Sequence, residues 1–157
     1  MKLSLSKKSL APSNAKIGSD LERKVCEVLK GYGFFAHNCI NGLNGQPCDI
    51  IAIHGDIALL LDCKHLDKGI RFDFKNIQEN QYNCFDKAEI YNNITRTGFV
   101  IYCELTQMTY FLPFRLVKAN ANYKNVSIHV DQLPTFKDTL NERRTEYENN
   151  DRGKNNY

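Results

Sequence analysis

The stretch PCDIIAIHGDIALLLDCKH, residues 47–65, is the most apolar run in a chain of 157 residues. Two β-type runs, CDIIAI and IALLLDC, are separated by HGD, which predicts a hairpin with a tight turn at Gly55-Asp56. Both runs are almost continuously apolar, so the hairpin is expected to be buried on both faces. Three charges nevertheless lie near its open end, and buried charges are rare without a partner or a metal.

A two-residue turn at positions 55 and 56 fixes which residues face each other across the hairpin. The two residue numbers of every cross-strand pair must add up to the same total as the two turn positions. Asp49 and Asp62 meet this condition, so their Cβ atoms are predicted to lie ~5 Å apart. Lys64 follows Asp62 by two residues and therefore lies on the same side of the strand. The hairpin is predicted to bring two carboxylates and one ammonium group together.

Two carboxylates this close repel each other and require a compensating positive charge. Lys64 is one source, and a divalent cation is the other, since Mg²⁺ prefers carboxylate and carbonyl oxygens. A metal there can lower the pKa of a water and stabilise charge on a phosphate, while Lys64 holds the attacking water or neutralises that charge. The alternative is a salt bridge between Asp62 and Lys64 at a strand end, with Asp49 capping a loop. The matching register of the third charge favours a site.

Helices and a second hairpin are predicted around this stretch. Apolar residues at steps of three and four predict a helix over residues 14–30, and a second helix is predicted over 76–91. FFAHN is a short strand before the first hairpin, GFVIYCEL and MTYFLPF form a hairpin around Thr106-Gln107, and RLVKANA is a short helix. The order helix, three strands, helix, two strands predicts an α/β fold with a mixed β-sheet flanked by helices.

The chain length fits one domain. We expect a flexible basic arm over residues 1–13, a single domain over 14–135, and a polar C-terminal tail, loose or partly helical, over 136–157. Residues 1–16 contain four lysines and no acid, a distribution that suits nucleic acid. On charge alone, a solvated disordered tail is the better-supported interpretation of that arm.

Composition excludes several classes of protein. No run approaches the roughly 18 apolar residues of a membrane helix, and the N-terminus has no apolar segment of the kind found in a signal peptide. These features predict a cytoplasmic protein without membrane contact. The six cysteines include no C-x-x-C pair, so they are expected to be reduced thiols that act as small core residues.

The segment PCD, with one residue inserted between Pro47 and Asp49, and the segment Asp62-Cys63-Lys64 at the end of the next strand together resemble the motif of the PD-(D/E)xK nuclease superfamily. The order of helices and strands is also similar to the restriction-endonuclease-like core of that superfamily. The resemblance implies a nuclease dependent on Mg²⁺ or Mn²⁺, with Asp49, Asp62 and the Cys63 backbone carbonyl as metal ligands. Lys64 then positions or activates the nucleophile.

Glu22, in the segment GSDLE of the first predicted helix, lies where many members of the superfamily carry a glutamate that helps to bind metal. The resemblance implies that Glu22 adds a ligand, directly or through water. The same residues also fit a capping box, Ser19-x-x-Glu22. The sequence leaves both interpretations open.

Gln81 is the polar member of an apolar stripe on the second predicted helix. The other members of the stripe are Ile77, Cys84, Phe85 and Ala88. A buried polar side chain needs partners. The resemblance supplies them, because a glutamine on this helix points at the active site in the superfamily and orients the lysine or a water.

Within the superfamily, DFKNIQENQ and GFVIYCEL…TYFLPFRLV resemble segments of the RecU-type Holliday-junction resolvases, and the similarity covers roughly residues 18–117. It implies that the substrate is branched DNA, four-way junctions above all, and that a two-fold homodimer cuts two strands symmetrically. RecU proteins carry a long stalk before the first catalytic aspartate. Only AHNCINGLNGQP precedes Asp49 here, so the metal site carries over more securely than junction specificity.

Basic residues around the predicted site are candidates for contacts with DNA phosphates, although each alone is also an ordinary solvated charge. They are Lys7, Lys8, Lys16, Arg23, Lys24, Lys68, Arg71 and Lys75. Two other functions fit the same residues: a restriction- or repair-type PD-(D/E)xK endonuclease, and a catalytically inactive DNA-binding module on the same fold.

Overall fold

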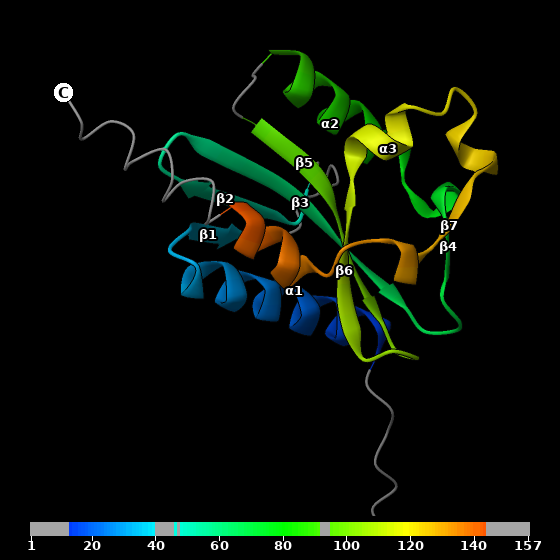
Figure 1. The fold of residues 1–157 in the computed structure, drawn as a ribbon, viewed down its shortest axis with the longest axis horizontal. Coiled ribbons are helices and arrows are strands. Elements are labelled where there is room, and N and C mark those ends of the chain that lie inside the picture. The colour runs from blue at the N-terminus through cyan, green and yellow to red at the C-terminus, as the bar shows by residue number, and fades with distance from the viewer. Residues whose placement is uncertain (1–12, 40–45, 47, 92–94, 144–157) are drawn as a thin grey trace, which may run out of the picture.

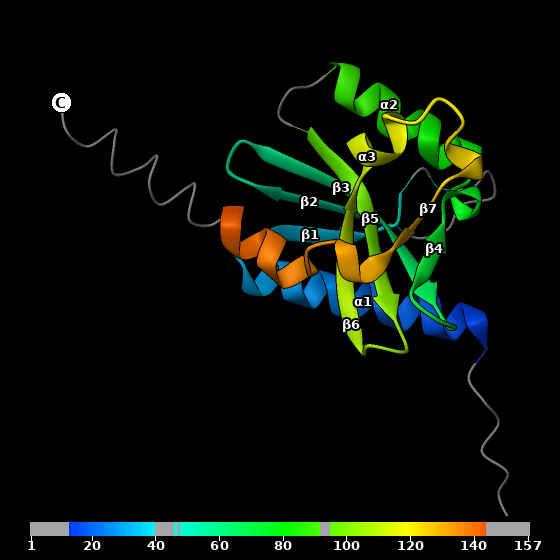
Figure 2. The ribbon, with the colours of Figure 1, turned by 45° about the vertical axis from the view of Figure 1, so that its right-hand side comes forward.

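A computed structural model describes residues 13–39, 46, 48–91 and 95–143. A five-stranded sheet forms its centre, with α1 against one face and α2 and α3 against the other (Figure 1, Figure 2). The helices and strands are α1 (Asn14–Gly31), β1 (Phe35–Asn38), β2 (Ile50–His54), β3 (Ile57–Leu66), β4 (Arg71–Asp73), α2 (Glu79–Tyr91), β5 (Thr95–Cys103), β6 (Met108–Pro113), α3 (Phe114–Lys118) and β7 (Ser127–His129).

The strand order in the sheet is β1-β2-β3-β5-β6. Every neighbouring pair is antiparallel except β3 and β5, which are parallel and are joined by a crossover through α2. Between β2 and β3, Ile50 pairs with Leu61, which is the register predicted from a two-residue turn. Gly55 in that turn has φ 58°, a conformation that glycine adopts without a steric penalty.

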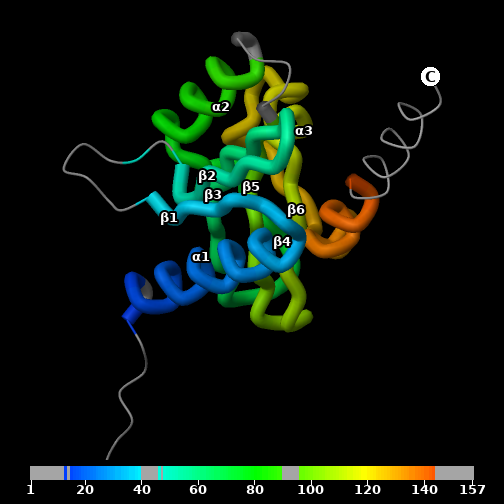
Figure 3. The backbone as a smooth tube through the Cα atoms, turned by 90° about the vertical axis from the view of Figure 1, so that its left-hand side faces the viewer, coloured from blue at the N-terminus to red at the C-terminus, as the bar shows by residue number. Residues whose placement is uncertain are grey.

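The prediction that the first hairpin is buried on both faces is wrong. In β2, Ile51 and Ile53 are 36% and 46% exposed, whereas the alternating Ile50 and Ala52 are fully buried. α1 packs along the face that carries Ile50 (Figure 3), whereas on the opposite face α2 packs mainly over β5 and leaves the part that carries Ile51 and Ile53 open. Phe35 of β1, paired with Ile53, is also exposed on that open face.

The sheet separates two apolar cores. Leu29 of α1 and Leu61 of β3 belong to the first core and are fully buried. The second core is rich in aromatic rings, and the Phe85 ring of α2 lies 5.3 Å from Phe99 and 5.7 Å from Phe114, measured between ring centroids. Phe85 therefore anchors α2 on β5, one helical turn after Gln81.

The fold continues past the predicted domain end at residue 135. Residues 136–143 are helical, and Phe136 and Leu140 are each 3% exposed within the core beneath α1. Residues four apart lie on one side of a helix, so the first part of the predicted polar tail is amphipathic and packs against the domain. The rest of that tail, and the arm over residues 1–12, lie outside the described residues.

The start of α1 rules out the capping-box interpretation of Ser19 and Glu22. Ser13 caps the helix, and its hydroxyl accepts a hydrogen bond from the Lys16 N–H at 3.4 Å. Ser19 and Glu22 therefore lie well inside the helix, where backbone N–H groups are already bonded to carbonyls one turn earlier. Glu22 is left available for another role.

Two other segments differ from the predictions. α2 begins at Glu79 rather than at residue 76, because residues 74–76 form a separate 3₁₀ turn. The segment after β3, where no strand is predicted, contains β4, which pairs with β7 in a small second sheet. All six cysteines are free thiols, and no helix in the described part of the chain is long and apolar enough to cross a membrane.

Candidate active site

A cavity of about 280 Å³ lies beside the start of β2 and the end of β3. All five residues predicted to be catalytic line it, and they come from α1, β3, α2 and the residue before β2. Its lining consists of Glu22, Gln46, Asp49, Asp62, Cys63, Lys64, Gln78, Asn80 and Gln81. Side chains from distant parts of the sequence thus surround one small polar space.

Asp62, Lys64 and Gln81 form a closed network. Gln81 Nε2 donates to Asp62 Oδ1 at 2.5 Å, and Lys64 Nζ donates to Gln81 Oε1 at 3.0 Å and lies 2.8 Å from Asp62 Oδ2. Asp62 and Gln81 are buried, with 1% and 7% of their surface exposed. The Gln81 amide is oriented by both partners, because only its nitrogen can donate to the acid and only its oxygen can accept from the ammonium group.

Asp49 lies one residue before β2, so it does not form a ladder pair with Asp62. Its N–H donates to the Leu61 carbonyl at 2.9 Å, its carbonyl accepts from the Cys39 N–H at 2.7 Å, and its Oδ2 accepts from the Cys63 N–H at 2.7 Å. The N–H and carbonyl of a strand residue point to the same side. The Cys63 carbonyl is therefore directed to the Asp49 side, as a backbone ligand in this cavity must be.

Glu22 reaches the same group of carboxylates from α1. Burial raises the pKa of Glu22, a hydrogen bond with Asn38 lowers it, and the charge of Asp49 raises it. Glu22 therefore lies within electrostatic reach of Asp49 on the cavity wall. This position, in the interior of the helix, favours a role in the site.

The electrostatics of Asp62 are dominated by its burial. The pKa of Asp62 is raised to about 7, mainly by burial; the charge of Lys64 opposes the rise and that of Asp49 adds to it. Two neighbouring carboxylates thus lie in a poorly hydrated place, with the Lys64 ammonium group beside Asp62. A second cation beside them would favour the charged form of both.

Asp62→Asn is expected to flatten the pH dependence of stability. Because the folded-state pKa lies above the ordinary value of 3.8, the neutral carboxyl stabilises the folded protein at low pH, and this contribution is lost as the pH rises to about 7. Relative to the unsubstituted protein, the unfolding free energy of the asparagine variant should rise by up to about 1 kcal/mol for each pH unit between pH 4 and 7. Urea denaturation in EDTA measures the difference, and parallel pH curves would contradict it.

The donors around the cavity fit a hard divalent cation. Two carboxylates and a backbone carbonyl supply oxygen ligands, and Mg²⁺ is commonly held by few protein ligands because it keeps several waters. Within the described ranges, no three His, Cys, Asp or Glu side chains are grouped as a ready-made metal cage. Asp49, Asp62 and the Cys63 carbonyl could hold Mg²⁺ or Mn²⁺, with Glu22 adding a ligand directly or through water.

Gln46 is a lining residue that the sequence did not indicate. Its Nε2 donates to Asp49 Oδ1 at 2.8 Å, so it contacts a predicted metal ligand. Gln46 belongs to a stretch rich in Asn and Gly, a composition typical of a loop. Neither periodicity nor a motif singles out a glutamine in this stretch. Its role is identified only by its contact with Asp49 in the folded chain.

The predicted DNA-contacting residues fall into three groups. Lys16, Lys24 and Lys68 are exposed. Arg23, Arg71 and Lys75 are exposed and form surface ion pairs with acidic neighbours. Such pairs contribute little, so they leave these side chains able to turn to a phosphate. Lys7 and Lys8 lie outside the described residues.

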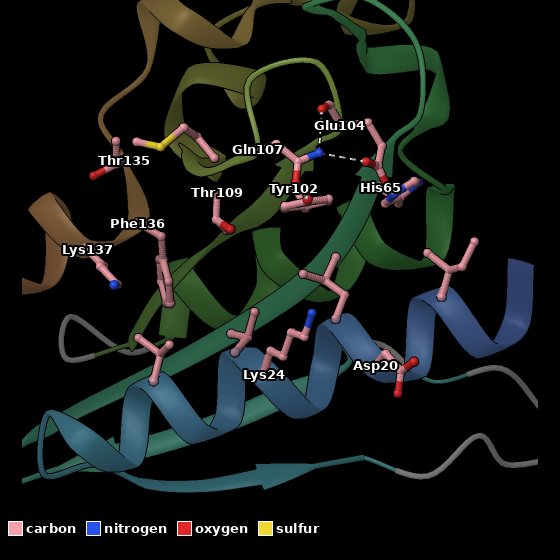
Figure 4. Close-up of a pocket in the computed structure, with 15 residues that line it drawn as sticks. Asp20, Lys24, His65, Tyr102, Glu104, Gln107, Thr109, Thr135, Phe136 and Lys137 are labelled. Carbon is pink, nitrogen blue, oxygen red and sulfur yellow. Dashed lines mark hydrogen bonds and ion pairs between the residues drawn. The ribbon is translucent and has the colours of Figure 1, made fainter. Parts of the chain in front are cut away.

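A larger cavity, of about 520 Å³, lies on the other face of the sheet between α1 and the β5–β6 hairpin (Figure 4). Four of its polar residues form one network: His65 lies 2.9 Å from Glu104, and Gln107 donates to Glu104 Oε2 at 3.1 Å and accepts from the Tyr102 hydroxyl at 2.9 Å. None of the predicted metal ligands lines this cavity. The grouping of carboxylates, lysine and amides makes the smaller cavity the candidate active site.

Comparison with known proteins supports the fold. No protein-family model and no curated protein sequence matches the chain. The crystal structure of Hjc, a Holliday junction resolvase from the archaeal hyperthermophile Archaeoglobus fulgidus, is similar with a TM-score of 0.60 and 17% sequence identity, over 78% of this chain and 99% of that one. The mixed sheet flanked by helices is thus a restriction-endonuclease-like fold, as predicted.

Proposed function

We propose that the chain is a divalent-metal-dependent endonuclease that hydrolyses phosphodiester bonds in branched DNA and resolves four-way junctions. The observation that carries the proposal is the convergence of Glu22, Asp49, Asp62, Lys64 and Gln81 on one cavity. They do so in a fold that is shared with a Holliday junction resolvase. The RecU-type resemblance supports the same substrate class, although the chain lacks the stalk of those proteins.

The cation belongs with the two aspartates. Asp49 and Asp62, with the Cys63 carbonyl, would hold Mg²⁺ or Mn²⁺, and Glu22 would add a ligand directly or through water. A bound divalent cation would lower the pKa of a water and stabilise negative charge on the phosphate. The raised pKa of Asp62 supports this assignment, because a carboxylate that is costly to ionise alone is stabilised by a neighbouring cation.

Lys64 acts on the reacting groups. Its side chain is 17% exposed and borders the cavity, so its ammonium group can donate to the attacking water or to the phosphate oxygen on which charge builds up. Gln81 accepts from Lys64 and donates to Asp62, which fixes the distance between the ammonium group and the carboxylate. Gln81 is thus a positioning residue for both.

DNA would approach the cavity along the exposed basic residues. Lys16, Lys24 and Lys68 are exposed and form no ion pair among the described residues, so they could contact phosphates directly, although Lys24 lines the larger cavity rather than this one. Symmetric cleavage of a four-way junction requires two active sites related by a two-fold axis, so the proposed functional unit is a homodimer. A cytoplasmic location, where the DNA substrate and reduced thiols coexist, is part of the same proposal.

Cleavage of a panel of synthetic DNAs tests the function. The unsubstituted protein is expected to cut a four-way junction in Mg²⁺ or Mn²⁺ and to cut Y-shaped and linear duplexes of the same sequence more slowly. Asp49→Ala should lose cleavage but keep DNA binding, because it removes a metal ligand and leaves the exposed basic residues intact. Gel-resolved initial rates, with EDTA as the metal-free reference, give the comparison.

Each other outcome would redirect the assignment. Equal rates on linear and four-way DNA would contradict junction resolution and favour a restriction- or repair-type enzyme. DNA binding without cleavage in either metal would mean an inactive DNA-binding module. Cleavage retained in Asp49→Ala would show that the active site lies elsewhere.

A further inference from the structure

We propose that Gln46 is a positioning residue that holds the Asp49 carboxylate in its metal-binding orientation and thereby raises affinity for the divalent cation. This inference rests on the proposed function. It concerns a residue outside the motif that defines the site. The hydrogen bonds around Asp49 carry the argument.

Four hydrogen bonds hold Asp49, although it lies outside the strand ladder. Two involve its own backbone, at 2.9 Å to Leu61 and 2.7 Å to Cys39. The other two reach the carboxylate, at 2.7 Å from the Cys63 N–H to Oδ2 and 2.8 Å from Gln46 Nε2 to Oδ1. Gln46 is the only one of the four partners that uses a side chain, so its contribution can be removed without changing the backbone.

The orientation of the Gln46 amide is set by Asp49. Its Nε2 faces Asp49 Oδ1, and rotating the amide by half a turn would put two oxygens against each other. Its Oε1 is buried and has no hydrogen-bond partner among the described residues. A buried, unpaired carbonyl oxygen is unfavourable, so the bond to the carboxylate decides how this side chain lies.

The two donors fix the plane of the carboxylate. Gln46 holds Oδ1 and Cys63 holds Oδ2, so rotation about the bond to the carboxylate carbon would break both bonds. Each carboxylate oxygen has about two acceptor positions, and one hydrogen bond leaves the other available to a cation. A ligand held in place before binding loses less freedom when the metal binds, and substituting partners of this kind typically lowers metal affinity by 10- to 100-fold.

The affinity for Mn²⁺ tests the proposal without using cleavage. Gln46→Met has nearly the same shape and cannot donate to Asp49, and we expect its Mn²⁺ dissociation constant to rise about 10- to 100-fold. Gln78→Met is the matched control, because Gln78 lines the same cavity but its hydrogen bond to Gln81 comes from its backbone N–H. The free Mn²⁺ signal in electron paramagnetic resonance gives the bound fraction, and urea denaturation shows that each variant is folded.

The outcomes separate this inference from the proposed function. If the unsubstituted protein does not bind Mn²⁺, the proposed function fails. If it binds and Gln46→Met binds equally well, or if Gln78→Met weakens binding as much as Gln46→Met, the role of Gln46 is contradicted and the proposed function stands. Should Gln46→Met not fold, Gln46→Asn replaces it, because its amide is one methylene too short to donate at 2.8 Å and the same weakening is expected.

Discussion

Replacing Lys64 with methionine is expected to slow metal-dependent DNA cleavage by about 10²- to 10⁴-fold, the usual contribution of a positioned proton-transfer or charge-stabilising group. The same substitution should leave the affinity for Mn²⁺ unchanged or higher. Lys64 Nζ lies 2.8 Å from Asp62 Oδ2, so the ammonium group competes with a cation for that carboxylate. Methionine keeps most of the apolar stem and removes the charge. Single-turnover cleavage and Mn²⁺ titration measure the two effects.

Two further variants make this result interpretable. Asp62→Asn should lose both cleavage and Mn²⁺ affinity, because it removes a ligand. Lys124→Met, at an exposed position that does not line the cavity, should change cleavage only slightly. If Lys64→Met weakened Mn²⁺ binding as much as Asp62→Asn, Lys64 would serve to hold the site together, and its assigned role in the chemistry would be wrong.

Phe85→Ala is expected to lower the unfolding free energy by about 3–5 kcal/mol, the usual cost of removing a large aromatic side chain from a core. Phe85 is fully buried and packs against Phe99 of β5 and Phe114 of α3. The cavity left behind would weaken the main attachment of α2 to β5. Urea denaturation at pH 7 measures the loss.

Phe35→Ala is the matched control. Phe35 is 70% exposed on the open face of β1, so the same change should cost no more than about 0.5 kcal/mol. Similar losses in the two variants would mean that α2 does not depend on Phe85 or that the open face of β1 is covered. Either result would contradict the packing described for these strands.

The register of the first hairpin could be predicted because it follows from local turn geometry. Once Gly55-Asp56 is the turn, every pair along β2 and β3 is determined, and the pairing of Ile50 with Leu61 agrees. Gln81 could also be predicted to be buried with partners, because a lone polar residue in an apolar stripe must find them. In both cases the prediction depends only on residues that are close to one another in the sequence.

The errors concern information that lies elsewhere in the chain. Whether Ile51 and Ile53 are covered depends on which strands α2 packs against. It packs against β5 and leaves both isoleucines exposed. The sequence could not decide between the two interpretations of Glu22, because the capping box is excluded only by Ser13, which caps the helix earlier. Gln46 was missed because its role exists only when the segment before β2 is folded against Asp49. None of these placements is visible in the periodicity of the segment concerned.

The turn at Gly55-Asp56 lies at the opposite end of the hairpin from the cavity, yet it sets the strand register that places Asp62 and Lys64 beside Asp49. If β2 and β3 paired one position out of register, Asp62 and Lys64 would no longer lie beside Asp49, and the two parts of the site would separate. Neither β5 nor β6 carries a residue that lines the cavity, so a register shift between those two strands would leave the lining residues in place. The site therefore depends directly on the strand pairing of one hairpin of this fold and not on that of the other.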